Sequence, residues 1–140
     1  MPGWVLFAVG SAFFAGLTAV LAKLGVSGVD SNLATLVRTA VILVFTATIV
    51  VATRAWQNPA ALPVRTLVFL VLSGLATGAS WLCYFRALQL GPASRVAPVD
   101  KLGVVFAVVL AVVFLGETLN WRLVAGLALI VSGGILVVFS

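Results

Sequence analysis

Apolar residues fill five long stretches of this 140-residue chain, and polar residues gather in the short segments between them. A helix rises about 1.5 Å per residue, so roughly 20 apolar residues cross a hydrocarbon core of about 30 Å. The pattern therefore predicts an all-α membrane protein whose five transmembrane helices form one bundle, a single domain over residues 1–140. The expected spans cover about residues 4–22, 33–53, 66–90, 93–115 and 121–139.

Composition strengthens this prediction. The chain is 64% hydrophobic and 8% charged, whereas soluble domains are about 45–50% apolar and about 25% charged. The first span lacks the basic start of a secretory signal and exceeds its usual apolar length, so we expect it to remain in the mature protein. These features predict a multi-pass protein of the cell inner membrane.

Several classes of function are excluded by what the chain lacks. Its net charge of +5 comes from bases scattered at helix ends, which is typical of membrane topology signals and not of nucleic-acid binding. Cys83 is the one cysteine and histidine is absent, so neither a disulfide within the chain nor a metal site is expected. No nucleophile and base are paired, so we predict no catalytic residues, no cofactor and no enzyme activity.

The bases near the membrane surfaces are divided evenly between its two sides. If the chain crosses five times, one side carries Arg54, Arg65 and Arg122, and the other carries Lys23, Arg86 and Arg95. Short loops rich in Lys and Arg normally stay in the cytoplasm. Arg38 and Lys101 lie deeper on the second side and give a weak preference for placing that side inside. Insertion in both orientations is therefore an open prediction.

The charged residues inside or bordering the spans all belong to one half of the bilayer. A charge at the centre of a membrane helix costs roughly 2.5–3.5 kcal/mol on insertion scales, so such residues usually face a cavity or a partner. We expect them to converge on a cavity that is basic overall and binds or couples to solute. The alternative for Lys23 and Arg86 is that they reach the interface with long side chains. The five residues are Lys23, Arg38, Arg86, Asp100 and Lys101.

Asp100 and Lys101 are neighbours within an apolar run. Adjacent residues of a helix point about 100° apart, so we expect them not to pair with each other but with residues of other helices. Pro98 removes a backbone donor and Gly103 thins the helix, which predicts a loosened segment of the kind that lines solute sites in transporters. The alternative is that Pro98 is a tolerated kink.

Trp81 and Tyr84 are three residues apart in the third span and share one helix face. The hypothesis is that they line an amphipathic wall of the cavity. The alternative is ordinary packing or anchoring at the interface.

The segment 87–98, which reads Ala-Leu-Gln-Leu-Gly-Pro-Ala-Ser-Arg-Val-Ala-Pro, resembles the EamA domain of the drug/metabolite transporter superfamily. The likeness continues through residues 99–102, 114–117 and 126–133, and Trp4, Ala12, Lys23 and Arg38 stand where that domain has similar residues. It covers essentially the whole chain and is closest in kind to the short five-helix members of bacteria and archaea. In those a serine commonly follows Pro-Val-Asp-Lys-Leu, whereas this chain has Gly103.

The resemblance implies a secondary transporter of small metabolites, commonly an exporter, built as half of a ten-helix molecule. A single copy is then expected to work by alternating access as a homodimer, and an antiparallel pair recovers the inverted-repeat geometry of fused relatives. A parallel dimer or a different partner subunit is the alternative. A second class of function is a non-transporting accessory subunit of a lipid carrier or an enzyme complex.

The related small multidrug exporters depend on a carboxylate in the first helix for proton exchange. Residues 13–16 of this chain, Phe-Phe-Ala-Gly, have no acid there. A basic cavity favours an anionic or zwitterionic solute, such as an amino acid or an organic acid, held by Lys101, Arg38 or Lys23.

Overall fold

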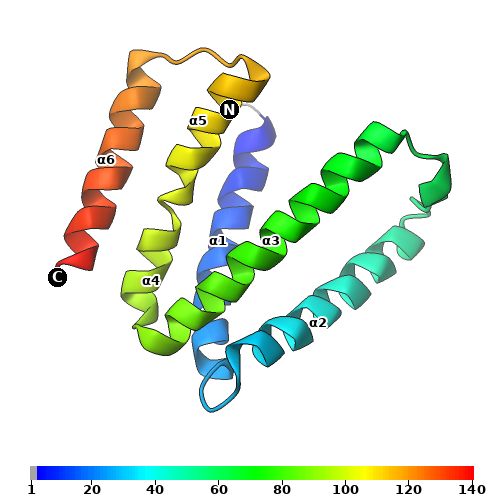
Figure 1. Ribbon diagram of the computed structural model, residues 1–140, viewed down its shortest axis with the longest axis horizontal. Helices are drawn as coiled ribbons and strands as arrows, with labels where there is room; N and C mark the ends of the chain where they lie inside the picture. Colours follow the sequence, from blue (N-terminus) through cyan, green and yellow to red (C-terminus); the bar gives the residue numbers. More distant parts are fainter. Residues whose placement is uncertain (1–2) are drawn as a thin grey trace. The chain divides into compact units, whose positions relative to one another are not determined.

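The computed structural model describes residues 3–140, and every regular element in that range is helical (Figure 1). The elements are α1 (Gly3–Gly25), α2 (Ser31–Ala52), the 3-10 turn η1 (Pro59–Ala61), α3 (Val64–Leu90), α4 (Ala93–Asp100), α5 (Gly103–Leu115) and α6 (Trp121–Val138). Five segments of the described chain have the length and hydropathy to cross a membrane, with α4 and α5 together forming the fourth. The predicted all-α membrane fold is confirmed.

Side chains next to the helices fix several of their ends. Asp30 precedes α2, and its Oδ1 accepts hydrogen bonds from the backbone N–H groups of Asn32 at 2.8 Å and Leu33 at 3.3 Å. Asn120 caps α6 in the same way by accepting from the Leu123 N–H at 2.8 Å. These bonds satisfy donors that have no partner in the first helical turn. Gly116 ends α5 with a φ of 68°, a left-handed conformation that glycine adopts without steric cost.

The chain divides into two compact units, and the divisions fall inside α1 and after α3. One unit holds residues 22–90, and the other holds the described residues 3–21 together with 91–140. The prediction of a single transmembrane domain stays a prediction. Each unit is described by itself.

In the unit 22–90, the first turns of α2 lie beside the last turns of α3 (Figure 1). The side chains buried in this unit gather at that end: Leu88 is 0% exposed, Val26 2% and Phe85 3%. Ser31 and Thr35 of α2 are also buried there. Loop 53–63 joins the opposite ends of the two helices and contains η1. The contacts at the first end therefore hold the two helices together.

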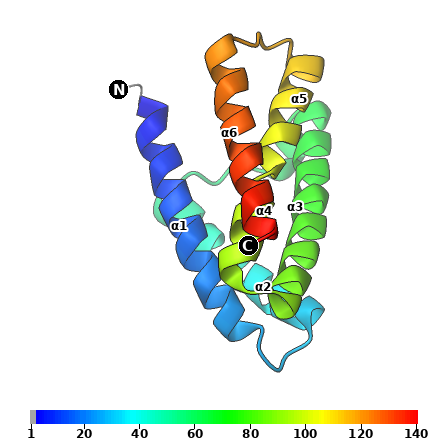
Figure 2. The same ribbon diagram turned by 90° about the vertical axis from the view of Figure 1, so that its left-hand side faces the viewer.

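In the other unit, α6 lies beside both α4 and α5 (Figures 1 and 2). Gly134 of α6 is buried, and a Cβ placed on it would come within 2.9 Å of Leu102 Cδ2. Leu102 stands between α4 and α5. The interruption of the fourth span is therefore packed directly against the last helix.

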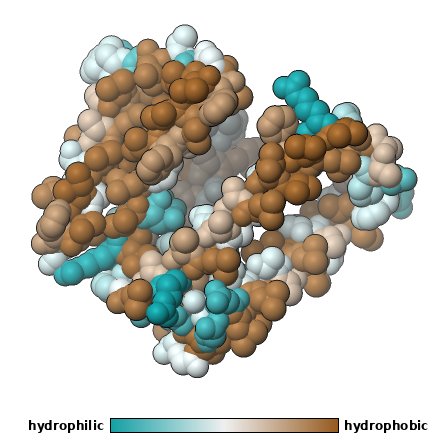
Figure 3. Space-filling model, in the orientation of Figure 1, coloured by the Kyte–Doolittle hydropathy of each residue, from teal (hydrophilic) through white to brown (hydrophobic). Residues whose placement is uncertain are grey.

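Most large apolar side chains of the spans are exposed, and hydrophobic residues dominate the face shown in Figure 3. A soluble protein rarely exposes apolar patches of more than a few hundred Å². Such a surface is stable against lipid tails, which are as apolar as the side chains. The chain is therefore a multi-pass membrane protein.

Candidate functional site

Arg38 of α2 and Trp81 of α3 form a cation–π contact. The guanidinium carbon of Arg38 lies 3.3 Å from the centre of the Trp81 ring, and both residues are partly buried. A cation stacked on an indole face is stabilised by about 0.5–2 kcal/mol, more where water is excluded. The ring thus supports a charge about two turns inside a membrane helix. Within residues 3–140 the guanidinium makes no hydrogen bond or ion pair, so its N–H groups remain available to a ligand.

Two further aromatic residues support Trp81. Tyr84 lies edge-on to it with ring centres 5.4 Å apart, and Phe85 is tilted against it at 5.9 Å. Phe85 is buried and also lies 5.7 Å from the Arg38 guanidinium carbon. Edge-to-face pairs of this kind favour a defined ring orientation. Trp81 of the predicted wall therefore contacts Arg38 and Tyr84 contacts Trp81, and the role of the two residues toward solute stays a prediction.

Lys23 bonds to a backbone carbonyl at the end of α3. Its Nζ donates a hydrogen bond of 2.5 Å to the carbonyl oxygen of Leu88, which ties the end of α1 to the end of α3. An ammonium has three donors, and the last carbonyls of a helix are a favourable site for a cation. This contact gives Lys23 a structural role at the helix ends, and its part in solute binding remains a prediction.

Arg86 is exposed one turn before the end of α3, and Gln89 orients it. Arg86 Nη1 donates to Gln89 Oε1 at 2.9 Å, and Gln89 Nε2 donates to the Val29 carbonyl at 2.5 Å and to that of Val26 at 3.4 Å. The amide thereby links the arginine to the turn between α1 and α2.

A hollow of about 730 Å³ opens beside Arg86, between the start of α2 and the end of α3. Its walls carry both charged and apolar side chains. They are Asp30, Ser31, Asn32, Leu82, Cys83, Arg86, Ala87 and Leu90.

Asp100 and Lys101 pair with each other, and the expectation that they would not was wrong. Lys101 Nζ lies 3.2 Å from Asp100 Oδ2, with the two side chains 61% and 38% exposed respectively. The expectation considered the directions of the two side chains and not the reach of a lysine. Lys101 follows the end of α4 with a near-helical backbone (φ −67°, ψ −13°), so adjacent side chains still point well apart there. The contact forms because the long, flexible lysine stem folds back to its neighbour.

The interruption between α4 and α5 replaces normal helical bonds with tighter ones. Lys101 N–H donates to Pro98 O at 3.2 Å and Leu102 N–H to Val99 O at 3.0 Å, both across three residues instead of four. Val104 and Val105 donate in the same three-residue pattern to Lys101 and Leu102. Such tightened turns inside a helix often mark a hinge or a functional site. Pro98 lies inside α4 and Gly103 begins α5, on either side of the interruption.

The structure thus places five of the predicted residues in the unit 22–90 and the other four in the second unit. The first group is Lys23, Arg38, Trp81, Tyr84 and Arg86, and the second is Pro98, Asp100, Lys101 and Gly103. Convergence of the two groups on one cavity stays a prediction.

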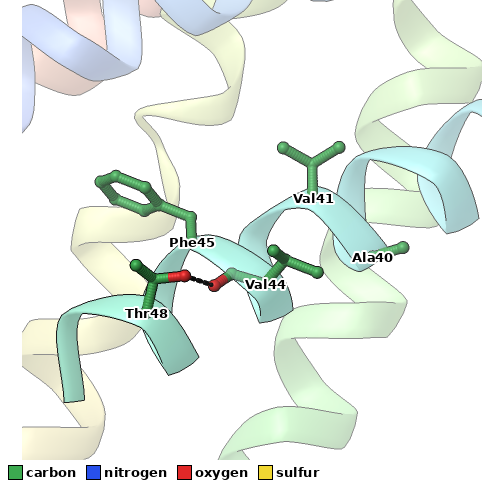
Figure 4. A pocket seen from close by; sticks show the side chains of 5 residues that line it. All are labelled: Ala40, Val41, Val44, Phe45 and Thr48. Carbon is green, nitrogen blue, oxygen red and sulfur yellow. Dashed lines mark hydrogen bonds between the residues drawn. The ribbon is translucent and has the colours of Figure 1, made fainter. Parts of the chain in front are cut away.

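A separate hollow of about 530 Å³ lies along α2 and has no charged lining (Figure 4). Its lining residues all come from this helix, and its one hydroxyl, that of Thr48, donates to the Val44 carbonyl at 2.8 Å. Such a surface offers apolar contact and no group that would orient a polar solute. Among residues 3–140, no three His, Cys, Asp or Glu side chains are grouped as a metal site would require.

Sequence reasoning missed Gln89 and Phe85. Gln89 could have been found, since it follows Arg86 by three residues and shares its helix face. Phe85 gave no such signal, because one more aromatic residue in an apolar span is ordinary and only the approach of α2 reveals its contact with Arg38.

Comparison with known proteins gives a consistent picture. The sequence matches the EamA-like transporter family over residues 2–139. A protein of Sinorhizobium sp named "Uncharacterized transporter in cobO 3'region" is 56% identical over 133 residues, covering 95% of this chain and 94% of that protein. No solved structure matches. The relative is therefore similar in length to this chain, and both likenesses indicate a transporter rather than an enzyme.

Proposed function

Because the chain belongs to the EamA-like transporter family, we propose that it is a secondary transporter that exports small anionic or zwitterionic metabolites, such as amino acids or organic acids. It resides in the cell inner membrane and works by alternating access as a homodimer. The family and the name of the Sinorhizobium relative support transport. The solute class, the direction of transport and the dimer are what we propose in addition.

The observation that carries the solute class is the stacking of Arg38 on Trp81. The ring covers one face of the guanidinium, and the N–H groups point outward in its plane. A carboxylate matches two of these donors at once, and such bidentate pairs are stronger than neutral hydrogen bonds. A cation inside a membrane helix that has no counter-ion in the protein is stabilised when a ligand of opposite charge binds to it.

The number of candidate spans supports the dimer. Transporters with inverted repeats place the solute between two halves of opposite orientation, and five spans in each half give that relationship. The even division of bases between the two sides of this chain supports insertion in both orientations. Two antiparallel copies then supply both halves from one gene product.

Uptake into liposomes tests the proposal. Purified protein is reconstituted alone and loaded with unlabelled amino acids or organic acids, and exchange for external labelled solute is followed. We expect exchange by the wild type and at least about a tenfold loss in Arg38→Gln, since a charge-assisted contact contributes roughly 1.5–3 kcal/mol. Inertness toward all tested solutes, with the protein correctly folded, would favour the accessory-subunit function instead.

A further inference from the structure

We propose that the hollow between the start of α2 and the end of α3 is a binding site for a zwitterion that carries a primary ammonium and an acidic group. An amino acid with an apolar side chain has this chemistry. The hollow measures about 730 Å³ and lies wholly within the unit 22–90. Small-molecule sites are typically clefts of about 300–1,000 Å³. The choice of a small metabolite rests on the proposed function, whereas binding can be measured without transport.

Arg86 provides the cationic wall. It makes no ion pair within residues 3–140, and its one hydrogen bond uses Nη1. Gln89 receives that bond and is itself anchored to the Val29 carbonyl. The arginine is therefore oriented before any ligand arrives, and its remaining N–H groups are available to an acidic group. Preorganisation of this kind reduces the entropic cost of binding.

Asp30 provides the anionic wall. Its Oδ1 accepts from the N–H groups of Asn32 and Leu33, while Oδ2 has no hydrogen bond or ion pair within the described chain. The cap therefore uses the backbone donors at the start of α2, and they are not offered to an anion. A primary ammonium can donate to Oδ2 without disturbing the cap.

The two charges line the same hollow without pairing with each other. An anion alone would meet Asp30, and a cation alone would meet Arg86, so each single charge encounters a like-charged wall. A zwitterion satisfies both walls at once. Leu82, Ala87 and Leu90 add apolar surface to the same hollow. This combination selects an amino acid with an apolar side chain over organic acids or amines.

Two sources share the required chemistry. One is a free amino acid, and the other is the headgroup of phosphatidylethanolamine, in which a primary ammonium accompanies a phosphate. The headgroup of phosphatidylcholine has a quaternary ammonium that donates no hydrogen bond. Comparison of these compounds therefore separates the sources.

Cys83 lines the hollow, is exposed and is the sole cysteine of the sequence, so the unmodified protein carries its own reporter. The rate of Cys83 alkylation by a maleimide is measured in detergent with leucine, N-acetyl-leucine or leucine methyl ester. We expect leucine to slow alkylation and the two derivatives, each lacking one charge, to have little effect. Equal slowing by either derivative would overturn the proposal.

Three variants locate the site. Asp30→Asn keeps a good capping residue and removes the charge, and Arg86→Gln removes the cation. Each should raise the leucine concentration for half-protection by about tenfold or more. Arg95→Gln is the matched control, because Arg95 carries the same charge but does not line the hollow. Unchanged protection in Arg86→Gln, or equal loss in Arg95→Gln, would contradict the assignment.

A separate experiment tests the lipid headgroup. It measures Cys83 alkylation in nanodiscs without leucine. Slower alkylation in phosphatidylethanolamine than in phosphatidylcholine, abolished by Asp30→Asn, identifies the headgroup as the zwitterion. Protection by neither leucine nor phosphatidylethanolamine overturns the site. Protection without uptake into liposomes would refute the transport proposal alone, and uptake without protection would refute this site alone.

Discussion

Leu102 and Gly134 lie so close that a Cβ on the glycine would stand 2.9 Å from Leu102 Cδ2. Leu102 belongs to the interruption between α4 and α5, and Gly134 belongs to α6. The absence of a side chain at position 134 therefore lets α6 approach the point at which the fourth span is interrupted. A hinge at that point would be braced by the last helix.

The first prediction concerns this contact. Gly134→Ala should destabilise the protein by about 1–3 kcal/mol relative to Gly133→Ala, because both gain the same helix propensity but only the first overpacks against Leu102. Thermal unfolding in detergent measures the difference. The double variant Leu102→Ala with Gly134→Ala should recover part of the loss. Equal stability of the two single variants would show that Leu102 moves aside without cost.

The spans could be predicted from sequence because the length of an apolar run is a local property and the bilayer sets the required length. Capping of a helix start also depends on neighbouring residues only, as Asp30 does for α2. The pairing of Asp100 with Lys101 could not be predicted, because it depends on how a flexible lysine side chain folds back. The stacking of Arg38 on Trp81 depends on how α2 meets α3, which no local pattern encodes.

The second prediction tests that stacking. Trp81→Leu should weaken solute affinity about 3- to 30-fold, since a partly buried cation–π contact contributes roughly 0.5–2 kcal/mol and also orients the guanidinium. Trp81→Phe should retain most of the solute affinity. The measurement is the solute concentration giving half-maximal uptake. Arg65 offers a control, because it lies 5.9 Å from the Phe69 ring at the exposed start of α3, and Phe69→Leu should leave affinity unchanged.

The third prediction concerns Gln89, whose amide joins Arg86 to the turn between α1 and α2. Gln89→Ala should release that turn and speed hydrogen exchange of its backbone amides, at residues 26–30, by about tenfold for a loss of about 1.4 kcal/mol in local opening. Gln57→Ala removes the same side chain from an exposed loop and should change nothing there. Unaltered exchange in Gln89→Ala would show that Lys23 and its bond to Leu88 suffice to hold the turn.

The fourth prediction addresses the pair of Asp100 and Lys101. Asp100→Asn or Lys101→Gln alone leaves one unpaired charge in a span, which costs roughly 2.5–3.5 kcal/mol on insertion scales, so each should lower the membrane yield. The double variant carries no charge there and should recover the yield. We expect uptake to remain lost in the double variant. Full uptake by the double variant would show that the pair has only a structural role.

The fifth prediction concerns orientation in the membrane. Near its surfaces the membrane is expected to have three bases on each side, Arg54, Arg65 and Arg122 against Lys23, Arg86 and Arg95. Reporters fused to the C-terminus should therefore be active both inside and outside the cell. Arg54→Gln leaves two bases against three and should shift the population toward one orientation.

If antiparallel pairs are the working form, uptake per molecule must fall with that shift, because copies in excess find no partner of opposite orientation. Restoring the balance with Arg54→Gln and Arg95→Gln together should restore uptake. Activity from one C-terminal reporter alone, with uptake intact, would replace the antiparallel dimer with a parallel one or with a different partner subunit.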